Sequence, residues 1–318
     1  MTGWQAVRHA GPVTVTVRPA HSDSEAQAAL QALPPLIDTA SNRRLQSVRS
    51  LEATFAQGQR SAGRTWLAVV GDERRAAVGA RVVPGVALID VLAGPERDAV
   101  PSLLAAATAW ARDQSEAELS CYAGEAGVDD PRVLVDEILA AGWTLTVSRH
   151  QFELTAAPGR QAPTERLPLR LTRASGADRP RLLGVVAGML SGSLDVRDRS
   201  AVERHGEGAA ARLLDDLIDA DPVECIRIAT DHEGNDVGLV SWRSMGSGTG
   251  YLTQVGVVRE ARGRGYGRAL VAEATRQLLA EGSRTLVATT DATNLPMVRA
   301  FQEVGWPSTE TRLDFALR

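Results

Sequence analysis

A strand, a glycine-rich turn and a helix follow one another in residues 250–281. The apolar run that ends at Val258 stops at charged residues, and an apolar pattern at helical spacing resumes after the turn. Arg262, Gly265 and Gly267 lie between them as R-x-x-G-x-G. Glycines let the backbone approach a ligand closely, and a helix N-terminus offers unpaired N–H donors and partial positive charge. This segment therefore predicts a site for an anion with several oxygens, most simply a pyrophosphate.

Three other interpretations of the turn fit the residues less well. A Walker P-loop ends in Gly-Lys-Ser/Thr, and the sequence contains no lysine. A Rossmann fingerprint needs G-x-G-x-x-G, whereas Gly263, Gly265 and Gly267 are spaced G-x-G-x-G. A solvated Arg/Gly turn would not need a strand, a turn and a helix in register. We therefore retain the anion-binding loop.

Two segments resemble the GNAT acyltransferase superfamily. The run V-x-V-x-x-x-x-R-G-R-G-Y-G-R-A-L from Val255 is similar to its acetyl-CoA loop, and the run from Asn294 through Phe301 to Trp306 is similar to N-x-x-A-x-x-x-Y-x-x-x-G-F. The resemblance implies an α+β fold with a mostly antiparallel sheet and acetyl-CoA as acyl donor. It also implies a set of cofactor-binding residues, which are Val255, Gly256, Val257, Arg262, Gly263, Arg264, Gly265, Tyr266, Gly267, Arg268, Asn294 and Phe301.

Composition and charge limit the remaining classes. A net charge of −4 argues against a general nucleic-acid binder, whose surface is basic. No apolar run reaches transmembrane length, and the N-terminus lacks an export signal, so we expect a cytoplasmic protein with free thiols at Cys121 and Cys225. All 35 basic residues are arginine, which indicates a GC-rich and, we expect, bacterial genome. The histidines are scattered without ligand spacing, so we predict no metal site.

The two halves of the chain repeat each other. Gly142-Trp143 is followed by Arg149 and Phe152 at the same spacing at which Gly305-Trp306 is followed by Arg312 and Phe315. The run 101–108 aligns with 268–275, and residues 156–167 have linker composition. We predict two tandem GNAT-like domains, 1–155 and 168–318, and this layout resembles that of mycothiol synthases. The oligomeric state stays open between monomer and homodimer.

The repeat predicts that the two domains differ in chemistry. Glu96, Asp98 and Val100 take the places of Gly263, Gly265 and Gly267 in the alignment. Two carboxylates would repel phosphate, and residues with a Cβ resist the backbone geometry that glycine permits. We predict that 1–155 is a degenerate domain that does not bind CoA, and that 168–318 is catalytic.

The pattern in the second half predicts a definite order of elements. We expect a loop over 191–206 between two of the helices. Strands are predicted at 169–173, 223–230, 237–245, 250–258, 284–290 and 309–317, and helices at 178–190, 207–220, 265–281 and 295–304.

Acetyl transfer to an amine requires a polarised thioester carbonyl, a neutral amine and a thiolate that leaves. In enzymes similar to this chain, backbone N–H groups of the strand at 255–257 polarise the carbonyl. The general base is open: Tyr251, Thr253 and Gln254 are candidates on the central strand, with a water relay as an alternative. His205 and Asp195, in the loop 191–206, could contribute from the acceptor side.

The acid that protonates the thiolate is missing at its expected position. The family's tyrosine aligns with Phe301, which has no proton to give and which also suits a core position. The thiolate could leave unassisted, since an alkyl thiol has a pKa of about 8.5, or Tyr251 or a water could act instead. Asn294 suits either the pantetheine arm or a helix N-cap.

These features predict an acetyl-CoA-dependent N-acetyltransferase. Its acceptor would be the primary amine of a small molecule: an amino acid, an aminosugar or antibiotic, or a thiol-sugar precursor. A protein N-terminus or lysine is a second acceptor class. A catalytically silent acyl-CoA-binding module and a ligand-free scaffold are the alternatives of a different class.

Overall fold

The computed structural model describes residues 15–83, 86–124, 132–156, 169–220, 222–245 and 248–317. The chain forms two compact units, of which unit 1 comprises 1–146 with 312–318 and unit 2 comprises 147–311. These bounds differ from the predicted domains 1–155 and 168–318 because each copy's last strand changes unit partway along its length. Most of the predicted linker, residues 157–167, lies outside the described residues.

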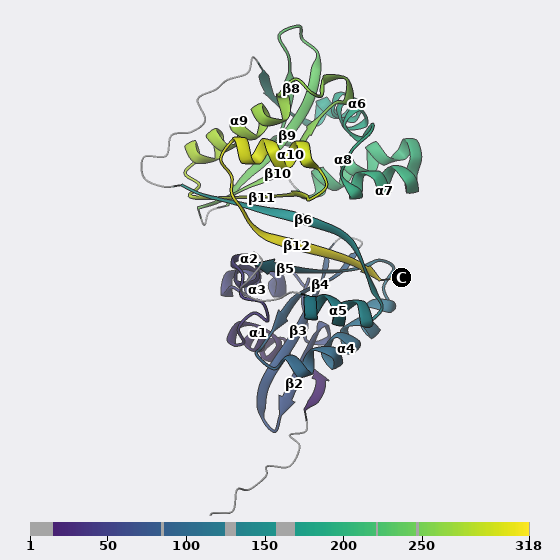
Figure 1. The fold of residues 1–318 in the computed structure, drawn as a ribbon, viewed down its shortest axis with the longest axis vertical. Helices are drawn as coiled ribbons and strands as arrows, with labels where there is room; N and C mark the ends of the chain where they lie inside the picture. Colours follow the sequence, from purple (N-terminus) through teal and green to yellow (C-terminus); the bar gives the residue numbers. More distant parts are fainter. Residues whose placement is uncertain are drawn as a thin grey trace, which may run out of the picture. The chain divides into compact units, whose positions relative to one another are not determined.

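Unit 1 contains the first copy of the repeated order of elements (Figure 1). Its strand order is β1-β2-β3-β4-β5, and the end of β12 belongs to the same unit. Among the described residues, β1–β2, β2–β3 and β3–β4 pair antiparallel, whereas β4 and β5 run parallel over Ala87–Ile89. The elements of this first copy are β1 Thr16–Pro19, α1 Asp23–Ala32, α2 Ala40–Leu45, α3 Val48–Ala56, β2 Thr65–Val70, β3 Glu73–Val83, β4 Val86–Ala93, α4 Val100–Arg112, β5 Ala117–Gly124, α5 Arg132–Ala140 and β6 Trp143–Thr155, of which residues 147–155 belong to unit 2.

The second copy repeats the same order of helices and strands, mostly within unit 2. The strand order of unit 2 is β6-β11-β10-β9-β8-β7, and among its described residues β10 and β11 pair in parallel whereas the other neighbouring strands pair antiparallel. The elements are β7 Arg170–Arg173, α6 Arg179–Leu190, α7 Val196–His205, α8 Ala209–Ala220, β8 Ile226–Thr230, β9 Asp236–Met245, β10 Thr249–Val257, α9 Tyr266–Ala280, β11 Thr285–Asp291, α10 Leu295–Glu303 and β12 Ser308–Leu317. The predicted mixed α+β fold with a mostly antiparallel sheet is confirmed.

The predicted loop 191–206 is wrong in part, because α7 occupies most of it. Asp195 is the N-cap, and its carboxylate accepts hydrogen bonds from the N–H groups of Arg197 and Asp198. None of the side chains of α7 is buried, so the helix has no apolar stripe for a periodicity argument to detect. The cap and the acidic first turn provide the sequence signal that was available.

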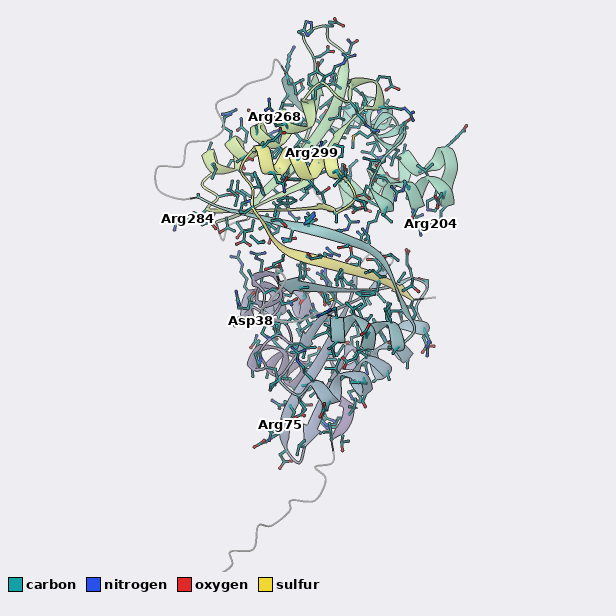
Figure 2. All side chains as sticks on the ribbon, viewed as in Figure 1. Asp38, Arg75, Arg204, Arg268, Arg284 and Arg299 are labelled. Carbon is teal, nitrogen blue, oxygen red and sulfur yellow. The ribbon has the colours of Figure 1, made fainter. Side chains whose placement is uncertain are left out.

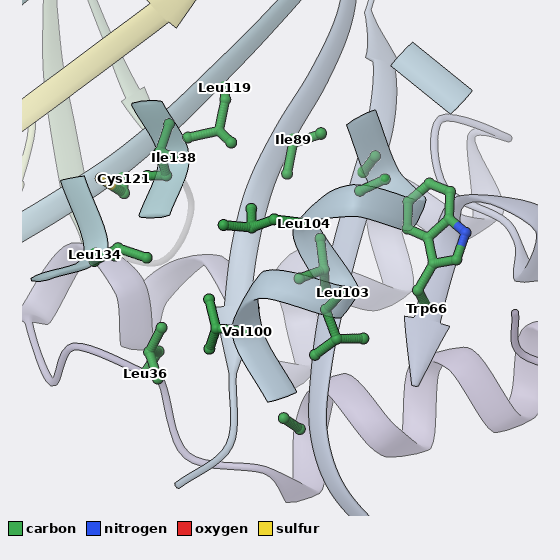
Figure 3. Packing of buried hydrophobic residues seen from close by; sticks show 14 of the residues in the cluster. Leu36, Trp66, Ile89, Val100, Leu103, Leu104, Leu119, Cys121, Leu134 and Ile138 are labelled. Atoms are coloured by element: carbon green, nitrogen blue, oxygen red, sulfur yellow. The ribbon is translucent and has the colours of Figure 1, made fainter. Parts of the chain in front are cut away.

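One hydrophobic core of unit 1 forms between α4 and the sheet, and a second forms where α1 and α3 cover β2, β3 and β4. Leu103 and Leu104 of α4 lie against Ile89 of β4 and Leu119 of β5, as Figure 3 shows. In unit 2 the sheet is covered on both faces: α9 and α10 cover β6, β10 and β11, whereas α6 and α8 cover β8 and Leu239 of β9. This arrangement leaves β10 and β11 with one face fixed against α9 and α10.

The internal repeat is visible as the same buried hydrogen bond in each unit. The indole Nε1 of Trp143 donates to Thr108 Oγ1 at 2.8 Å in unit 1, and Trp306 Nε1 donates to Thr275 Oγ1 at 2.9 Å in unit 2. The glycines before the two tryptophans have φ of +96° and +86°. The sequence alignment of 101–108 with 268–275 therefore also describes equivalent positions in the fold.

Candidate functional site

The strands β10 and β11 diverge at the centre of unit 2. They pair in parallel only over Thr249–Tyr251 with Thr285–Val287. Beyond this point β10 continues to Val257 beside β9, and β11 continues to Asp291 beside β6. Among the described residues, the edge of β10 beyond Tyr251 therefore has no paired strand on its β11 side. Its main-chain N–H and C=O groups can bind a ligand there.

The glycine loop connects this strand to the N-terminus of α9. Gly263 and Gly265 have φ of +78° and +81°, a left-handed conformation that strongly favours glycine. Gly265 is the N-cap of α9, and no side chain caps the helix. A Cβ on Gly263 would meet no atom within 4 Å, so the loop faces open space. The N–H groups of the first turn of α9 are available to an anion.

The three arginines of the loop differ in what they contact. Arg262 donates from Nε to Val257 O at 3.2 Å, from Nη1 to Gly192 O at 2.8 Å and from Nη2 to Met189 O at 2.6 Å. Its guanidinium is therefore bound to main-chain carbonyls, and burial lowers its pKa. Arg264 is exposed, and Nη1 of Arg268, the residue labelled in Figure 2, lies 3.8 Å from Glu303 Oε2. Arg264 and Arg268 are thus the better placed charges for an anion at the loop.

The predicted thioester strand is closely covered at one position. A Cβ on Gly256 would lie 1.9 Å from Met189 Cε, so only glycine admits this side chain of α6. Val255 and Val257 are half-buried and contact the core beneath α9. The β10 register against β9 shifts between Leu252 and Gln254, which is a β-bulge that alters the direction of the following residues.

The base candidates on β10 have different surroundings. Tyr251 and Gln254 are half-buried, and the guanidinium carbon of Arg243 lies 5.9 Å from the centroid of the Tyr251 ring. Thr253 Oγ1 donates to Ser241 O at 3.1 Å, so its proton is already engaged. Outside β10, His205 is exposed in the last turn of α7, and Asp195 caps that helix as described above.

Asn294 caps helix α10 and Phe301 lies within it, so the structure shows what each residue contacts. Asn294 Oδ1 accepts from Met297 N at 3.4 Å, so the predicted N-cap is confirmed. Phe301 is only 2% exposed and stacks on Phe152 with ring centroids 4.7 Å apart. We predicted that Phe301 contacts the cofactor, but its burial leaves almost no surface for a ligand. The structure instead supports the alternative of a core aromatic residue.

An ion-pair cluster that the sequence analysis did not identify lies where β11 ends. Arg149 Nη1 of β6 lies 2.9 Å from Asp291 Oδ1 and 3.5 Å from Asp195 Oδ2. The other oxygen of Asp291 accepts from Val196 N at 2.6 Å. Asp291 is fully buried, and burial raises its pKa. Three segments that are distant in sequence thus meet at one carboxylate.

Asp198 is the second functional candidate that sequence reasoning missed. Burial is the main cause that raises the pKa of its carboxyl to about 6, and the neighbouring carboxylates of Asp195 and Asp291 add to the effect. Ser193 Oγ donates to Asp198 Oδ2 at 2.6 Å, and this hydrogen bond acts in the opposite direction by lowering the pKa of Asp198. A carboxyl group with a pKa near 6 can exchange protons close to neutral pH. The S-x-D-x-x-D run at 193–198 was the only signal in the sequence.

The corresponding turn in unit 1 has a different structure. Glu96 has a φ of −82°, Arg97–Ala99 form a short 3₁₀ turn, and α4 begins at Val100. Glu96 is half-buried and Asp98 is exposed. Carboxylates therefore occupy the place of the two left-handed glycines.

The described part of the chain has neither a metal-ligand cluster nor a membrane-spanning helix. Within 15–83, 86–124, 132–156, 169–220, 222–245 and 248–317, no group of three or more His, Cys, Asp or Glu could hold a metal ion. In the same part of the chain, none of the helices has the length and apolar character needed to cross a membrane.

Comparisons with known proteins agree with this geometry. Residues 191–306 match the model of the acetyltransferase (GNAT) family. The matched residues all lie in unit 2, and this match supports an acyltransferase. Comparison with curated proteins gives no match.

Solved structures share the fold over nearly the whole chain. A GCN5-related N-acetyltransferase from Sphaerobacter thermophilus is 15% identical with a TM-score of 0.66, and the match covers 95% of both chains. A tandem GNAT protein from the clavulanic acid biosynthesis pathway is 17% identical with a TM-score of 0.56, covering 95% of this chain and 98% of its own. An acetyltransferase from Colwellia psychrerythraea is 13% identical, with a TM-score of 0.54 and coverage of 95% and 100%. At these identities the likeness shows the fold alone.

Proposed function

We propose that unit 2 transfers the acetyl group of acetyl-CoA to a primary amine of a small molecule. The observation that carries this proposal is the divergence of β10 from β11 next to the uncapped N-terminus of α9. The divergence leaves main-chain donors along β10, and the helix start adds donors for phosphate. Both groups of donors follow one another along the chain, as the pantetheine arm and the diphosphate do in CoA.

The roles of the residues follow from this placement. The N–H groups from Gly263 to Arg268 would hold the diphosphate, with Arg264 and Arg268 supplying charge. The N–H groups of Val255–Val257 would hold the thioester oxygen and stabilise the negative charge that develops on it during attack. The amine nitrogen forms a bond to the carbonyl carbon, the C–S bond breaks, and the electron pair leaves on sulfur. With Phe301 in the core, we propose that the thiolate leaves without an acid from α10.

Removal of the amine proton needs a group whose pKa lies near the working pH. The pKa of Asp198, raised to about 6, meets this condition. Tyr251 and Gln254 instead lie on β10, the strand that diverges from β11. We therefore propose these three as the groups to test for proton transfer, with Gln254 acting through a water. Substitution of each by a residue of similar size, Asp198→Asn, Tyr251→Phe and Gln254→Met, separates them by their pH profiles of kcat/KM.

A direct test combines binding and turnover. Calorimetry with CoA should show binding to the wild type and none to Gly265→Glu, since the new side chain adds negative charge and a Cβ at φ of +81°. The free energy of unfolding of Gly265→Glu should change less than its affinity, because this turn faces solvent. Gly282→Glu, at φ of +87° beyond the other end of α9, is the matched control and should keep CoA binding. Retained CoA affinity in Gly265→Glu would contradict the loop assignment.

A catalytically silent acyl-CoA-binding module is the second candidate. The buried Phe301 favours it, because α10 provides no acid there. Thiol release from acetyl-CoA should be measured with free amino acids, glucosamine and a peptide with a free N-terminus and a lysine. Turnover with one of them supports the enzyme and names its acceptor class. CoA binding without turnover across the whole panel supports the module.

We also propose that unit 1 does not bind CoA. The carboxylates of Glu96 and Asp98 stand where unit 2 has Gly263 and Gly265. Calorimetry on the whole chain should therefore give one CoA per chain, and Gly265→Glu should remove it completely. A residual second site in that variant would contradict the assignment.

A further inference from the structure

The segment that joins α6 to α7 is fastened at both ends, and we call residues 192–196 the strap. At its first end, Arg262 donates to Gly192 O at 2.8 Å and to Met189 O at 2.6 Å. The same guanidinium donates to the carbonyl of Val257, the last residue of β10. The first end of the strap is thus tied to the end of β10.

The second end of the strap is tied to the end of β11. Val196 N donates to Asp291 Oδ2 at 2.6 Å, and Asp291 is the last residue of β11. Arg149 lies between Asp291 and Asp195 and contacts both carboxylates. We call Arg149, Asp195 and Asp291 the latch.

The strap therefore connects the ends of the two strands that diverge. Strands that pair lie about 4.8 Å apart, whereas four peptide steps from Gly192 to Val196 reach at most about 14 Å. The strap thus limits how far the strand ends separate, and the latch fixes its β11 end. Because the latch side chains are mostly buried, with Arg149 8% and Asp291 0% exposed, this end is held by desolvated contacts.

Charge explains why Arg149 is needed at this position. Asp195 and Asp291 carry two carboxylates, and Arg149 is the cation that contacts both. Removing its charge would leave like charges facing each other across the strap in a poorly solvated place. A lysine has a single ammonium on a flexible stem, so it would hold one carboxylate well and not both.

The geometry points to Arg149 and Asp291 as positioning residues for the amine side of the acetyl-transfer site. They hold the strap, and with it Asp198 and Ser193, in a fixed place beyond the diverging strands. This inference rests on the proposed function of unit 2. It assigns a role in that function to Arg149, which lies in the first copy of the sequence repeat. The donor side depends instead on the glycine loop, with Arg264 and Arg268 as its charges.

The experiment compares Arg149→Met, Arg149→Lys and Asp291→Asn with the wild type, in the full chain. Hydrogen exchange of the peptide that spans 192–198 reports the latch directly, because Val196 N–H is one of its bonds. Steady-state kinetics with acetyl-CoA and the amine selected by the panel gives KM for each substrate and kcat. Calorimetry with CoA gives donor affinity. Arg276→Met is the matched control, since it breaks an arginine–carboxylate pair with Glu273 within α9.

We expect Arg149→Met and Asp291→Asn to speed exchange in 192–198 and to lower kcat/KM for the amine about 10- to 100-fold. CoA affinity should stay within about twofold, because the glycine loop is unchanged. Arg149→Lys should restore part of the loss, and Arg276→Met should match the wild type in all three measurements.

Two outcomes overturn the inference. Fast exchange in 192–198 with unchanged kcat/KM for the amine would make the latch purely structural. Loss of CoA affinity with an unchanged KM for the amine would place the strap on the donor side. If the wild type neither binds CoA nor turns over, the proposed function fails and this role fails with it, whereas the exchange data still decide whether the latch holds the strap.

Discussion

At the scale of single residues, Asp198 couples the candidate site to pH. Burial raises the pKa of its carboxyl from 3.8 to about 6, so the folded protein binds this proton more tightly than the unfolded chain does. Because of this difference, Asp198 lowers the free energy of unfolding as pH rises from about 4 to about 6. Above about pH 6 this loss has reached its full value. The buried carboxyl of Asp291, whose pKa is also raised, acts in the same direction.

We predict that Asp198→Asn is more stable than the wild type near pH 7 and similar to it near pH 4. The asparagine cannot ionise and can still accept from Ser193, so the penalty disappears. Urea unfolding at pH 4, 5, 6 and 7 should show a difference in the free energy of unfolding that grows to about 1–3 kcal/mol. A difference that does not change with pH would contradict the raised pKa.

The observed contacts of Arg262 differ from the contact that its position in the sequence predicts. Its position beside the glycines predicts a phosphate contact, whereas its three donors bind carbonyl oxygens of α6, the strap and β10. The sequence cannot reveal this, because the carbonyl acceptors belong to the main chain and carry no residue signature. Phe301 is the opposite case, since its lack of a hydroxyl already favoured the core position that the structure confirms.

Among the elements, each unit repeats one contact between a helix and a tryptophan that begins β6 or just precedes β12. Thr275 of α9 accepts from Trp306 Nε1 and donates to Val271 O, and Thr108 of α4 accepts from Trp143 Nε1. Both indoles are buried, so each N–H depends on this partner.

We predict that Thr275→Val and Thr108→Val each lower the free energy of unfolding by about 1–3 kcal/mol, because a buried N–H loses its acceptor. Urea unfolding followed by tryptophan fluorescence measures the loss. In a double-mutant cycle with Trp306→Phe, the Thr275→Val change should cost less, since no donor remains to be left unpaired. Additive losses in the cycle would contradict the contact.

Most elements of unit 2 follow the apolar periodicity of the sequence, and α7 does not. Its residues are mostly polar and none of its side chains is buried, with only Ala201 packed in part against the core. Asp195 caps this helix and Asp291 accepts from Val196 N, and a helix held mainly at its end gives little periodic signal. The latch was missed for the same reason, because its members come from β6, β11 and the strap.

In the whole molecule, part of the last strand of each sequence copy belongs to the other unit. Residues 149–155 of β6 pair with Asp291–Thr285 of β11 in unit 2, and Phe152 belongs to the core of that unit. Phe315 of β12 belongs to the core of unit 1. Neither contiguous half of the chain therefore contains a complete sheet.

We predict that residues 168–318 expressed alone do not form a stable unit, although they contain the entire glycine loop. The fragment would lose the β6 partner of β11 and the ring of Phe152, whose burial alone contributes about 1.5–3 kcal/mol. Circular dichroism with urea unfolding should show no cooperative transition. Addition of a peptide covering residues 143–155 should increase the folded fraction. A fragment as stable as the full chain would contradict the strand exchange.

The mixed α+β fold, the order of nearly all elements in unit 2 and the glycine turn could be predicted from residue patterns, because apolar periodicity and turn residues are local properties. Three features became visible in the folded chain alone: the unit to which each end of β6 and β12 belongs, the position of the Arg262 guanidinium, and the contacts of Arg149 with Asp195 and Asp291. These depend on contacts between residues far apart in the chain. Spacing along the sequence carries no information about them.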